Sequence, residues 1–342
     1  MVLKRDLDII LDTKANWNKL KNSNVLVTGA TGRLGIYIAQ ALIELNDRKQ
    51  SNIGVYLLAR SKEKLENSYG NLLNRSDVHV LQQDVTAPIK VDANIDYIFH
   101  TAGLASPSDF TYRPIDTLWG HVQGTKNVLD LASEKKTKKV LYVSTVEIYG
   151  TWTSEEGIKE NDMGPLDCFN FRACYPEAKR LCETMLACYE YEKHVDYVSI
   201  RMSHTLGPGV SLNDGRAFAE FIRKTLNDED IVLESDGSAE RKYTYVADAV
   251  GAMFLALLNG TEHSYNVANV SNLISIKKLA DLIASFSKTK KTKVVYSSPD
   301  KALAYLPFKL GVLDSSKIIK LGWTPKIDVE TLFKWTYESF EK

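Results

Sequence analysis

Short apolar runs alternate along the chain with longer stretches in which apolar residues recur every three or four positions. Six of the runs have the length and composition of buried strands: 24–29, 54–60, 78–84, 95–103, 139–145 and 195–202. After the first run, one face of a predicted helix carries Leu34, Ile38, Ala41, Leu42 and Leu45. Each connection is long enough for the right-handed crossover that joins parallel strands. The pattern predicts an α/β fold built on a doubly wound parallel sheet.

The two ends of the chain differ from this central part. The first 22 residues alternate charged with apolar side chains, and we expect an amphipathic helix there that docks through Leu7, Ile10, Leu11 and Trp17. After residue 204, loops such as TLGPG and ESDGS separate shorter elements. We therefore predict three parts: a docking helix at 1–22, the sheet domain at 23–204 and a smaller α+β lobe at 205–342.

Composition and charge narrow the classes of partner. The 342 residues carry 43 basic and 43 acidic side chains, so no net field draws the chain to nucleic acid or to an anionic membrane. No run approaches the roughly 20 apolar residues that span a bilayer, and the N-terminus lacks the apolar core of a signal peptide. The cysteines crowd together without metal-ligand spacing at Cys168, Cys174, Cys182 and Cys188. These features predict a cytoplasmic protein with reduced thiols and no metal site.

Between the first strand and the first helix, the sequence TGATGRLG contains a GxxGxxG pattern. Glycines at these positions allow a tight turn and let the backbone approach a pyrophosphate, to which the helix N-terminus offers free N–H groups and a positive dipole end. The order strand, turn, helix predicts a Rossmann-type dinucleotide site. We expect cofactor contacts throughout this turn, from Gly29, Thr31, Gly32, Arg33, Leu34 and Gly35.

The end of the second strand discriminates between NAD and NADP. NAD enzymes usually place Asp or Glu there to bind the ribose hydroxyls. This chain has Arg60, which suits a 2′-phosphate, and Arg33 in the turn would add a second positive group. We therefore expect NADP or NAD, with NADP favoured. The ends of the third and fourth strands should also line the cofactor, through Asp84, Val85, Thr101, Ala102 and Gly103.

A tyrosine and a lysine, Tyr175 and Lys179, lie four residues apart in CYPEAK and so share one face of a predicted helix. A free tyrosine has a pKa of about 10, and we expect the Lys179 ammonium, with a positive nicotinamide, to lower the pKa of Tyr175. Lys179 is also expected to hold the nicotinamide ribose. The preceding strand ends in Ser144 and Thr145, whose hydroxyls can bind the substrate oxygen that Tyr175 deprotonates. This order of motifs predicts an oxidoreductase-type active site.

Together these motifs resemble, from residue 24 to the C-terminus, the extended short-chain dehydrogenase/reductases of the NAD-dependent epimerase/dehydratase family. The motifs are TGATGRLG, FHTAGLASP, STVEIYG, CYPEAK, RMSHTLGPG, RKYTYVADA, YNVAN and LGWTP. Within this group, the segments ASPSDFTYRPIDTLWGHVQGTKNVLDLA, CYPEAKRLCET and LNDGRAFAEFI are most similar to the UDP-glucuronate decarboxylases. The resemblance implies a dinucleotide-binding domain at 23–204, a lobe at 205–342 that mainly binds the nucleotide sugar, and a nucleotide-sugar substrate.

The resemblance also implies that the reaction begins with oxidation at C4 of the sugar, which acidifies the proton at C5. Family 4,6-dehydratases carry Thr-Asp-Glu at the strand end, where the Asp protonates the departing hydroxyl and the Glu removes the C5 proton. This chain has Thr145, Val146 and Glu147, so the Glu is kept and an aliphatic group replaces the acid. Loss of CO₂ from a β-keto acid needs no general acid, so decarboxylation fits this strand end better than dehydration.

For the substrate, the resemblance implies four contacts. Arg241 in ERKYTYVAD and Arg216 in NDGR are expected to hold the diphosphate, and Ser106 and His204 to line the same site. His204 stands where the family usually has Asn, and so does His121 before the GT pair. With Arg60 in place of an acid, these are three departures from the decarboxylase pattern.

Four activities remain open from the sequence. The first is a lyase that oxidises C4 and then decarboxylates or dehydrates, and the second is a 4-epimerase or an NADPH-dependent 4-ketoreductase, which Arg60 would suit. The third, a non-enzymatic dinucleotide-binding protein, is disfavoured because Tyr175 and Lys179 are both present. The fourth, a dehydrogenase for small alcohols, is disfavoured by the long C-terminal lobe. Family members commonly dimerise through the helices that here begin near 115 and 174, so the resemblance also implies a homodimer.

Overall fold

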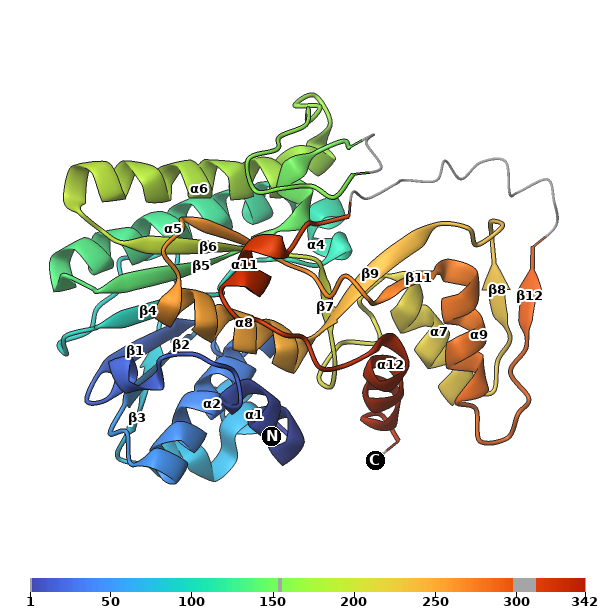
Figure 1. Ribbon diagram of the computed structural model, residues 1–342, viewed down its shortest axis with the longest axis horizontal. Coiled ribbons are helices and arrows are strands. Elements are labelled where there is room, and N and C mark those ends of the chain that lie inside the picture. The colour runs from blue at the N-terminus through green and yellow to red at the C-terminus, as the bar shows by residue number, and fades with distance from the viewer. Residues whose placement is uncertain (1, 153–155, 298–311, 342) are drawn as a thin grey trace.

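Seven parallel strands form the central sheet of this computed structural model, which describes residues 2–152, 156–297 and 312–341 (Figure 1). Within these residues the strand order is β10-β6-β5-β4-β1-β2-β3. The strands are β1 (Asn24–Thr28), β2 (Gly54–Ala59), β3 (Val78–Gln82), β4 (Tyr97–His100), β5 (Lys139–Thr145), β6 (Tyr197–Met202) and β10 (Ser264–Val267). The order reverses between β1 and β4, and doubly wound sheets bind ligands at such a point, beyond the carboxyl ends of the strands.

The parallel, doubly wound sheet predicted from the sequence is confirmed, and all six predicted strands are present. The seventh, β10, pairs in parallel with β6. The sequence analysis does not predict it, because its four residues lie in YNVAN and are too short a run to be told from a loop.

Side chains of β1 alternate between two hydrophobic cores, one on each face of the sheet. Val25 and Val27 face the core shared with α2 (Arg33–Lys49) and α8 (Val246–Asn259). Leu26 faces the core shared with α5 (Pro114–Lys135) and α6 (Cys174–Lys193). Figure 1 shows α5 and α6 above the sheet and α1, α2 and α8 below it. Both faces are covered, which explains why successive residues of β1, Val25 to Val27, are all apolar.

The N-terminal segment packs against the lower layer. Its helix α1 (Lys4–Leu11) and the short 3₁₀ turn η1 (Trp17–Leu20) bury Leu7, Ile10 and Trp17, while Leu11 is half-buried against the same core. Asp6 is fully buried and accepts hydrogen bonds from the hydroxyls of Tyr37 (3.0 Å) and Tyr245 (2.7 Å). These bonds join α1 to α2 and to the strand before α8.

The smaller lobe is built mainly from the C-terminal part of the chain. A three-stranded sheet contains β7 (His204–Leu206), β9 (Glu240–Tyr245) and β11 (Leu273–Ser275), and a second pair contains β8 (Ile231–Leu233) and β12 (Val294–Tyr296). The remaining helical elements are α3 (Lys62–Tyr69), η2 (Gly70–Asn74), α4 (Pro107–Tyr112), η3 (Val146–Tyr149), η4 (Phe171–Ala173), α7 (Ala217–Leu226), α9 (Ile276–Ser285), α11 (Ser316–Lys320) and α12 (Val329–Glu338).

The boundary at residue 204 does not divide the chain cleanly. Helix α8 lies against β5 and β6, and β10 forms the edge of the central sheet, so the stretch 246–267 returns to the first domain. Thirteen of the fourteen residues of α8 are buried, because the helix is covered by the sheet on one side and by α1 and α2 on the other.

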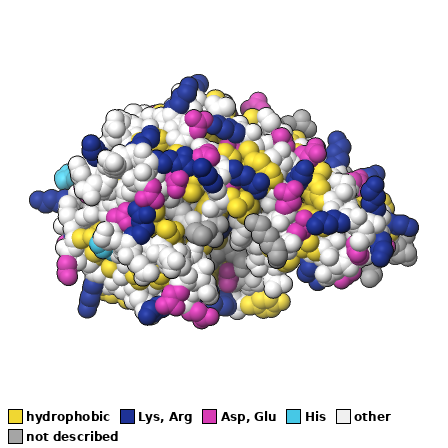
Figure 2. Space-filling model, turned by 90° about the horizontal axis from the view of Figure 1, so that it is seen from below, with side chains coloured by type: hydrophobic (Ala, Val, Ile, Leu, Met, Phe, Trp, Pro, Cys, Tyr) yellow, Lys and Arg dark blue, Asp and Glu magenta, His cyan; other side chains and the backbone are white. Residues whose placement is uncertain are grey.

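The surface carries both signs of charge. Figure 2 shows Lys and Arg side chains interspersed with Asp and Glu over the face seen from below. Among the described residues, no helix combines the length and the apolar character needed to cross a membrane. All four cysteines are free.

Candidate active site

Two cavities open at the carboxyl ends of the central strands and meet at the first turn of α2. The first, the β5 cavity, has a volume of about 740 Å³ and is lined by the end of β5, the start of α6 and lobe residues 203–205 and 216–218. The second, the glycine-turn cavity, has a volume of about 710 Å³ and is lined by the glycine turn and the ends of β2, β3 and β4. Adjoining cavities of this size fit a dinucleotide and a second ligand.

The glycine turn is built so that only glycine fits at two of its positions. Gly29 has a φ of +66°, and a Cβ on it would lie 2.8 Å from the Ala102 Cα atom. A Cβ on Gly35 would lie 2.4 Å from the Gly29 carbonyl oxygen. Gly32, the N-cap of α2, lines the cavity and leaves the first N–H groups of the helix free. This arrangement fits the pyrophosphate of a dinucleotide.

The other expected cofactor contacts surround the same cavity: Thr31, Arg60, Asp84, Val85, Thr101, Ala102 and Gly103. The Arg60 side chain is 68% exposed and its Nη1 atom lies 3.8 Å from an Asp84 oxygen. Asp84 also accepts hydrogen bonds from the backbone N–H and the hydroxyl of Thr86. The cavity rim therefore offers both a cation and an anion to the adenosine end of a dinucleotide.

Arg33 and its two neighbours lie differently from the sequence-based expectation. The Arg33 guanidinium lines the β5 cavity, where its Nη2 atom donates to the Thr205 carbonyl (2.7 Å), and Leu34 lines that cavity too. Gly35 is buried against Gly29 and lines neither cavity. Since Arg33 is the first residue of α2, its backbone follows the turn while its side chain extends toward the lobe. The expected pairing of Arg33 with Arg60 around one 2′-phosphate is therefore wrong.

Tyr175 and Lys179 lie one helical turn apart on α6, as predicted. The Tyr175 ring stacks on Phe110 with 4.4 Å between centroids and meets the His121 ring edge-on at 5.4 Å. The Lys179 Nζ atom lies behind it, 5.8 Å from the Tyr175 ring, and donates to the Val143 carbonyl (2.6 Å). Packing thus fixes the phenol at the wall of the β5 cavity.

The expected effect of Lys179 on Tyr175 is not found in the chain by itself. Burial raises the pKa of Tyr175 well above its usual value, and the charge of Glu147 adds to the rise. A hydrogen bond with Thr145 and the charges of Arg216 and Arg172 act in the opposite direction. Burial also lowers the pKa of Lys179 to about 8. Desolvation of the enclosed phenol therefore outweighs its neighbours.

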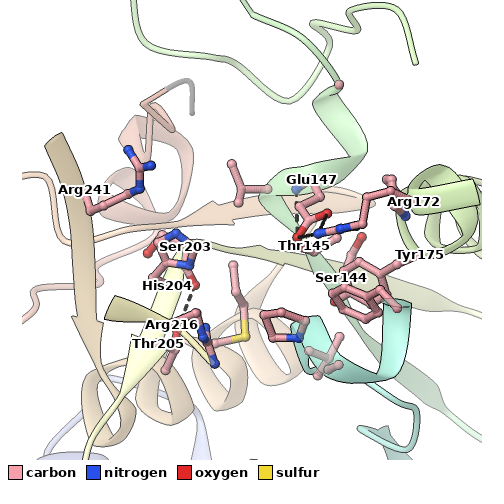
Figure 3. A pocket seen from close by; sticks show the side chains of 18 of the residues that line it. Ser144, Thr145, Glu147, Arg172, Tyr175, Ser203, His204, Thr205, Arg216 and Arg241 are labelled. Atoms are coloured by element: carbon pink, nitrogen blue, oxygen red, sulfur yellow. Dashed lines mark hydrogen bonds and ion pairs between the residues drawn. The ribbon is translucent and has the colours of Figure 1, made fainter. Parts of the chain in front are cut away.

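The end of β5 places three predicted groups beside Tyr175 (Figure 3). Thr145 is the N-cap of η3 and accepts a hydrogen bond from the Glu147 N–H (3.3 Å). The Ser144 hydroxyl is buried and has no hydrogen-bond partner among the described residues. Glu147 contacts Arg172, whose Nη2 atom lies 3.0 Å and 2.9 Å from its two carboxylate oxygens. Burial raises the pKa of Glu147, and the Arg172 charge opposes this rise.

Basic side chains from the lobe line the facing wall (Figure 3). Arg216 is paired with Asp214 through two hydrogen bonds, and Arg241 donates to the Glu240 carbonyl (2.8 Å). His204 is neutral at physiological pH, because burial and the charges of Arg216 and Arg241 lower its pKa to about 3. The expected substrate groups Arg216, Arg241 and His204 therefore share one cavity with Tyr175.

Ser106 is the expected substrate residue that the structure places elsewhere. Its hydroxyl donates to Asp109 (2.6 Å) and accepts from the Asp109 N–H (3.3 Å), which forms a capping box at the start of α4. Its neighbours Ala105 and Pro107 line the β5 cavity, whereas Ser106 does not. The N-cap requirement of α4 therefore accounts for the serine.

Sequence reasoning missed two residues of this site. Arg172 precedes Tyr175 by three positions, and its guanidinium lies over the Phe110 ring at 4.5 Å while it binds Glu147. Phe110 is the last residue of ASPSDF, at the start of a segment that resembles the decarboxylases, and its side chain carries no polar group. The available signal was the position of Arg172 three residues before Tyr175, in the short turn η4 that precedes α6.

Comparisons with known proteins agree with this geometry. The NAD dependent epimerase/dehydratase family matches residues 25–268, which is more than half of the chain. UDP-glucuronic acid decarboxylase 3 of Arabidopsis thaliana is 27% identical over 307 residues, covering 90% of this chain and 85% of the relative.

Two solved structures share the fold. UDP-glucose 4-epimerase of Thermotoga maritima with UDP-glucose has a TM-score of 0.76 at 23% identity and covers 93% of this chain and 98% of its own. dTDP-glucose 4,6-dehydratase of Bacillus anthracis in complex with NAD has a TM-score of 0.74 at 17% identity. The match covers 93% of this chain and 96% of the dehydratase chain. At these identities the structures establish the fold alone. The match over residues 25–268 establishes the family: the chain belongs to the NAD-dependent epimerase/dehydratase family, within the extended short-chain dehydrogenase/reductases.

Proposed function

We propose that the protein uses NAD or NADP to oxidise C4 of a nucleotide-bound sugar and then carries out lyase chemistry at C5, as a UDP-glucuronate decarboxylase does. One observation carries the proposal: Tyr175, Thr145 and Glu147 line a single cavity that adjoins the glycine turn. Relatives named UDP-glucuronic acid decarboxylase, 26–29% identical to the chain, support the choice of substrate.

In this proposal the Tyr175 oxygen takes the proton of the sugar 4-hydroxyl while Thr145 hydrogen-bonds the same oxygen. A bound oxidised nicotinamide supplies the hydride acceptor and a positive charge that favours the phenolate. Lys179, fixed by the Val143 carbonyl, holds the ribose and keeps a positive charge behind the phenol. Burial of Tyr175 excludes water from the hydroxyl to be oxidised.

In this proposal Glu147 acts at C5, the carbon next to C4. In a uronic acid, a C4 ketone makes the carboxylate part of a β-keto acid, so the C5–C6 bond breaks and CO₂ leaves. The electron pair stays on the C4–C5 enolate, and a proton then returns to C5, for which Glu147 is the donor. Val146 beside it is apolar and buried, so no acid stands there to protonate a departing 6-hydroxyl. This favours decarboxylation over 4,6-dehydration.

A 4-ketoreductase or 4-epimerase is the second candidate, and Arg60 favours it. Its mostly exposed guanidinium at the rim of the glycine-turn cavity suits the 2′-phosphate of NADPH, which a reductase consumes. A lyase or an epimerase returns its cofactor unchanged, so cofactor balance separates a reductase from the other two.

The test is NMR of UDP-glucuronate incubated with purified protein and catalytic NAD or NADP, with UDP-glucose and dTDP-glucose as parallel substrates. We expect UDP-glucuronate to give CO₂ and the UDP-pentose without net cofactor consumption. Stoichiometric oxidation of NADPH with a 4-keto sugar would favour the reductase. No change in any nucleotide sugar under either condition would refute the proposal.

We also propose that the protein is a homodimer formed through α5 and α6. These helices pack against each other and leave three large apolar side chains exposed to solvent: Ile115, Trp119 and Leu181. Sedimentation equilibrium would show twice the mass of the chain, and Trp119→Glu should shift it to the monomer. A monomeric wild type would contradict this assignment.

A further inference from the structure

The side chain of Arg33 lies where the two cavities meet. Its neighbour Gly32 lines the glycine-turn cavity, whereas the Arg33 guanidinium lines the β5 cavity together with Thr205, Arg216 and Phe218 of the lobe. One hydrogen bond, from its Nη2 atom to the Thr205 carbonyl (2.7 Å), fixes the guanidinium there. The residue thus extends from the cofactor-binding turn into the cavity that holds the expected substrate groups.

Asp214 acts electrostatically on the Arg33 charge, but its carboxylate is ion-paired with Arg216 and not with Arg33. No ion pair within the described part of the chain includes Arg33, and its buried Nε–H has no hydrogen-bond partner there. Burial, and then the charge of Arg216, lower the pKa of Arg33 to about 10, so the side chain remains charged at neutral pH. A buried, charged donor without a partner is unfavourable unless a ligand satisfies it.

The neighbouring groups add positive charge. Arg216 and Arg241 line the same cavity, and His204 between them is neutral. Asp214 pairs with Arg216, so three guanidinium groups are balanced by one carboxylate at this wall. A monoanion would leave part of this charge unmatched, whereas a diphosphate carries enough negative charge and enough acceptor oxygens to engage more than one guanidinium.

We propose that Arg33 binds the diphosphate of the nucleotide-sugar substrate in the β5 cavity. This inference rests on the proposed nucleotide-sugar function. The cofactor also contains a diphosphate, but the glycine turn offers that group its own backbone N–H groups facing the other cavity. The Arg33 guanidinium instead lies among lobe residues, beside Arg216.

The experiment measures the dissociation constants of UDP and of NADPH by calorimetry for the wild type, Arg33→Gln and Arg33→Lys. Glutamine carries no charge and its amide is two atoms shorter than the Arg33 Nη2 position, so we expect the UDP constant to rise about 10- to 100-fold. Lysine keeps the charge but loses the fork of donors, so a smaller rise, of about three- to tenfold, is expected. The NADPH constant should stay within about twofold. The control is Arg223→Met, which removes an exposed arginine on α7.

Circular dichroism establishes that each variant is folded, and the lysine variant alone suffices if the glutamine variant is not. UDP binding unchanged in a folded variant overturns the inference and leaves the proposed function intact. Weaker NADPH binding with unchanged UDP binding assigns Arg33 to the cofactor diphosphate and also overturns it. If the wild type binds neither UDP nor dTDP, CDP or GDP, the proposed function itself fails, and the inference fails with it.

Discussion

Replacing Arg172 by methionine removes the cation that forms an ion pair with Glu147. In the structure the Arg172 Nη2 atom lies 2.9 Å and 3.0 Å from the two Glu147 oxygens. Burial raises the pKa of Glu147, and the Arg172 charge opposes that rise. Without the arginine the pKa of Glu147 rises further. The proposed step at C5 needs protonated Glu147 as the proton donor, so it should then persist to a higher pH.

The size of the effect follows from the exposure of the pair. The Arg172 and Glu147 side chains are 40% and 28% exposed, so solvent screens their attraction. A half-exposed ion pair of this kind contributes about 1 kcal/mol. That energy corresponds to about a fivefold larger protonated fraction of Glu147 on the alkaline side of its titration. At low pH, where Glu147 is protonated in both proteins, this difference disappears.

The assay is the pH dependence of kcat from about pH 5 to about pH 9. It uses the nucleotide sugar that the wild type converts, and compares the wild type with Arg172→Met and Arg172→Lys. We expect the alkaline limb of the methionine variant to move to higher pH and the lysine variant to restore part of the shift. The matched control is Arg48→Met, which removes an ion pair with Glu44 on α2 far from both cavities. If kcat of Arg172→Met is lower by the same factor at every pH, and the pH of the limb is unchanged, the electrostatic argument is refuted.

Three further predictions concern the cofactor site and the core. Arg60→Glu should weaken NADPH binding about 10-fold or more and leave NAD binding within a few-fold, measured by fluorescence titration, and equal losses would contradict an NADP preference. Gly35→Ala should weaken binding of both dinucleotides about 10- to 100-fold in a folded protein, because the new Cβ would lie 2.4 Å from the Gly29 carbonyl, and unchanged binding would show that the turn relaxes. Arg201→Met should lower the free energy of unfolding by about 3–5 kcal/mol in urea titrations, because it leaves Glu183, whose carboxylate lies 2.6 Å away, unpaired in a site where the side chains are 7% and 14% exposed. A change below about 1 kcal/mol would mean that water reaches Glu183.

The sequence allowed prediction of those parts of the site that depend on local spacing. The glycine turn and the Tyr175–Lys179 pair each lie within one element, so the period of the helix and the geometry of the turn determine their positions. The place of the Ser144 and Thr145 hydroxyls could be predicted because they end the strand, β5, that comes before α6. Each of these groups is therefore positioned by its own element or by the order of neighbouring elements.

Contacts between distant segments were out of reach. Arg172 and Glu147 are separated by 25 residues, so their pairing depends on the path of the chain between η3 and η4. Arg33 and Thr205 are separated by 172, so their pairing depends on how the lobe packs on the sheet. For a related reason the sequence could not show that the pKa of Tyr175 is raised in the chain by itself, and the lowering expected beside a positive nicotinamide stays a prediction. The sequence shows the nearby lysine but not the burial of the phenol, and burial is the larger effect here. The strand β10 was missed because four residues carry too little pattern.

The most direct test of the account is the kinetics of Tyr175→Phe, which removes only the phenolic oxygen at the wall of the β5 cavity. The stacking of the ring on Phe110 is preserved, so the protein should fold and bind NAD(P) with unchanged affinity. Turnover of the nucleotide sugar should fall by about 10² to 10⁴. If the phenylalanine variant turns over at a rate within a few-fold of the wild type, the phenol is not the group that takes the proton, and the proposed reaction is wrong.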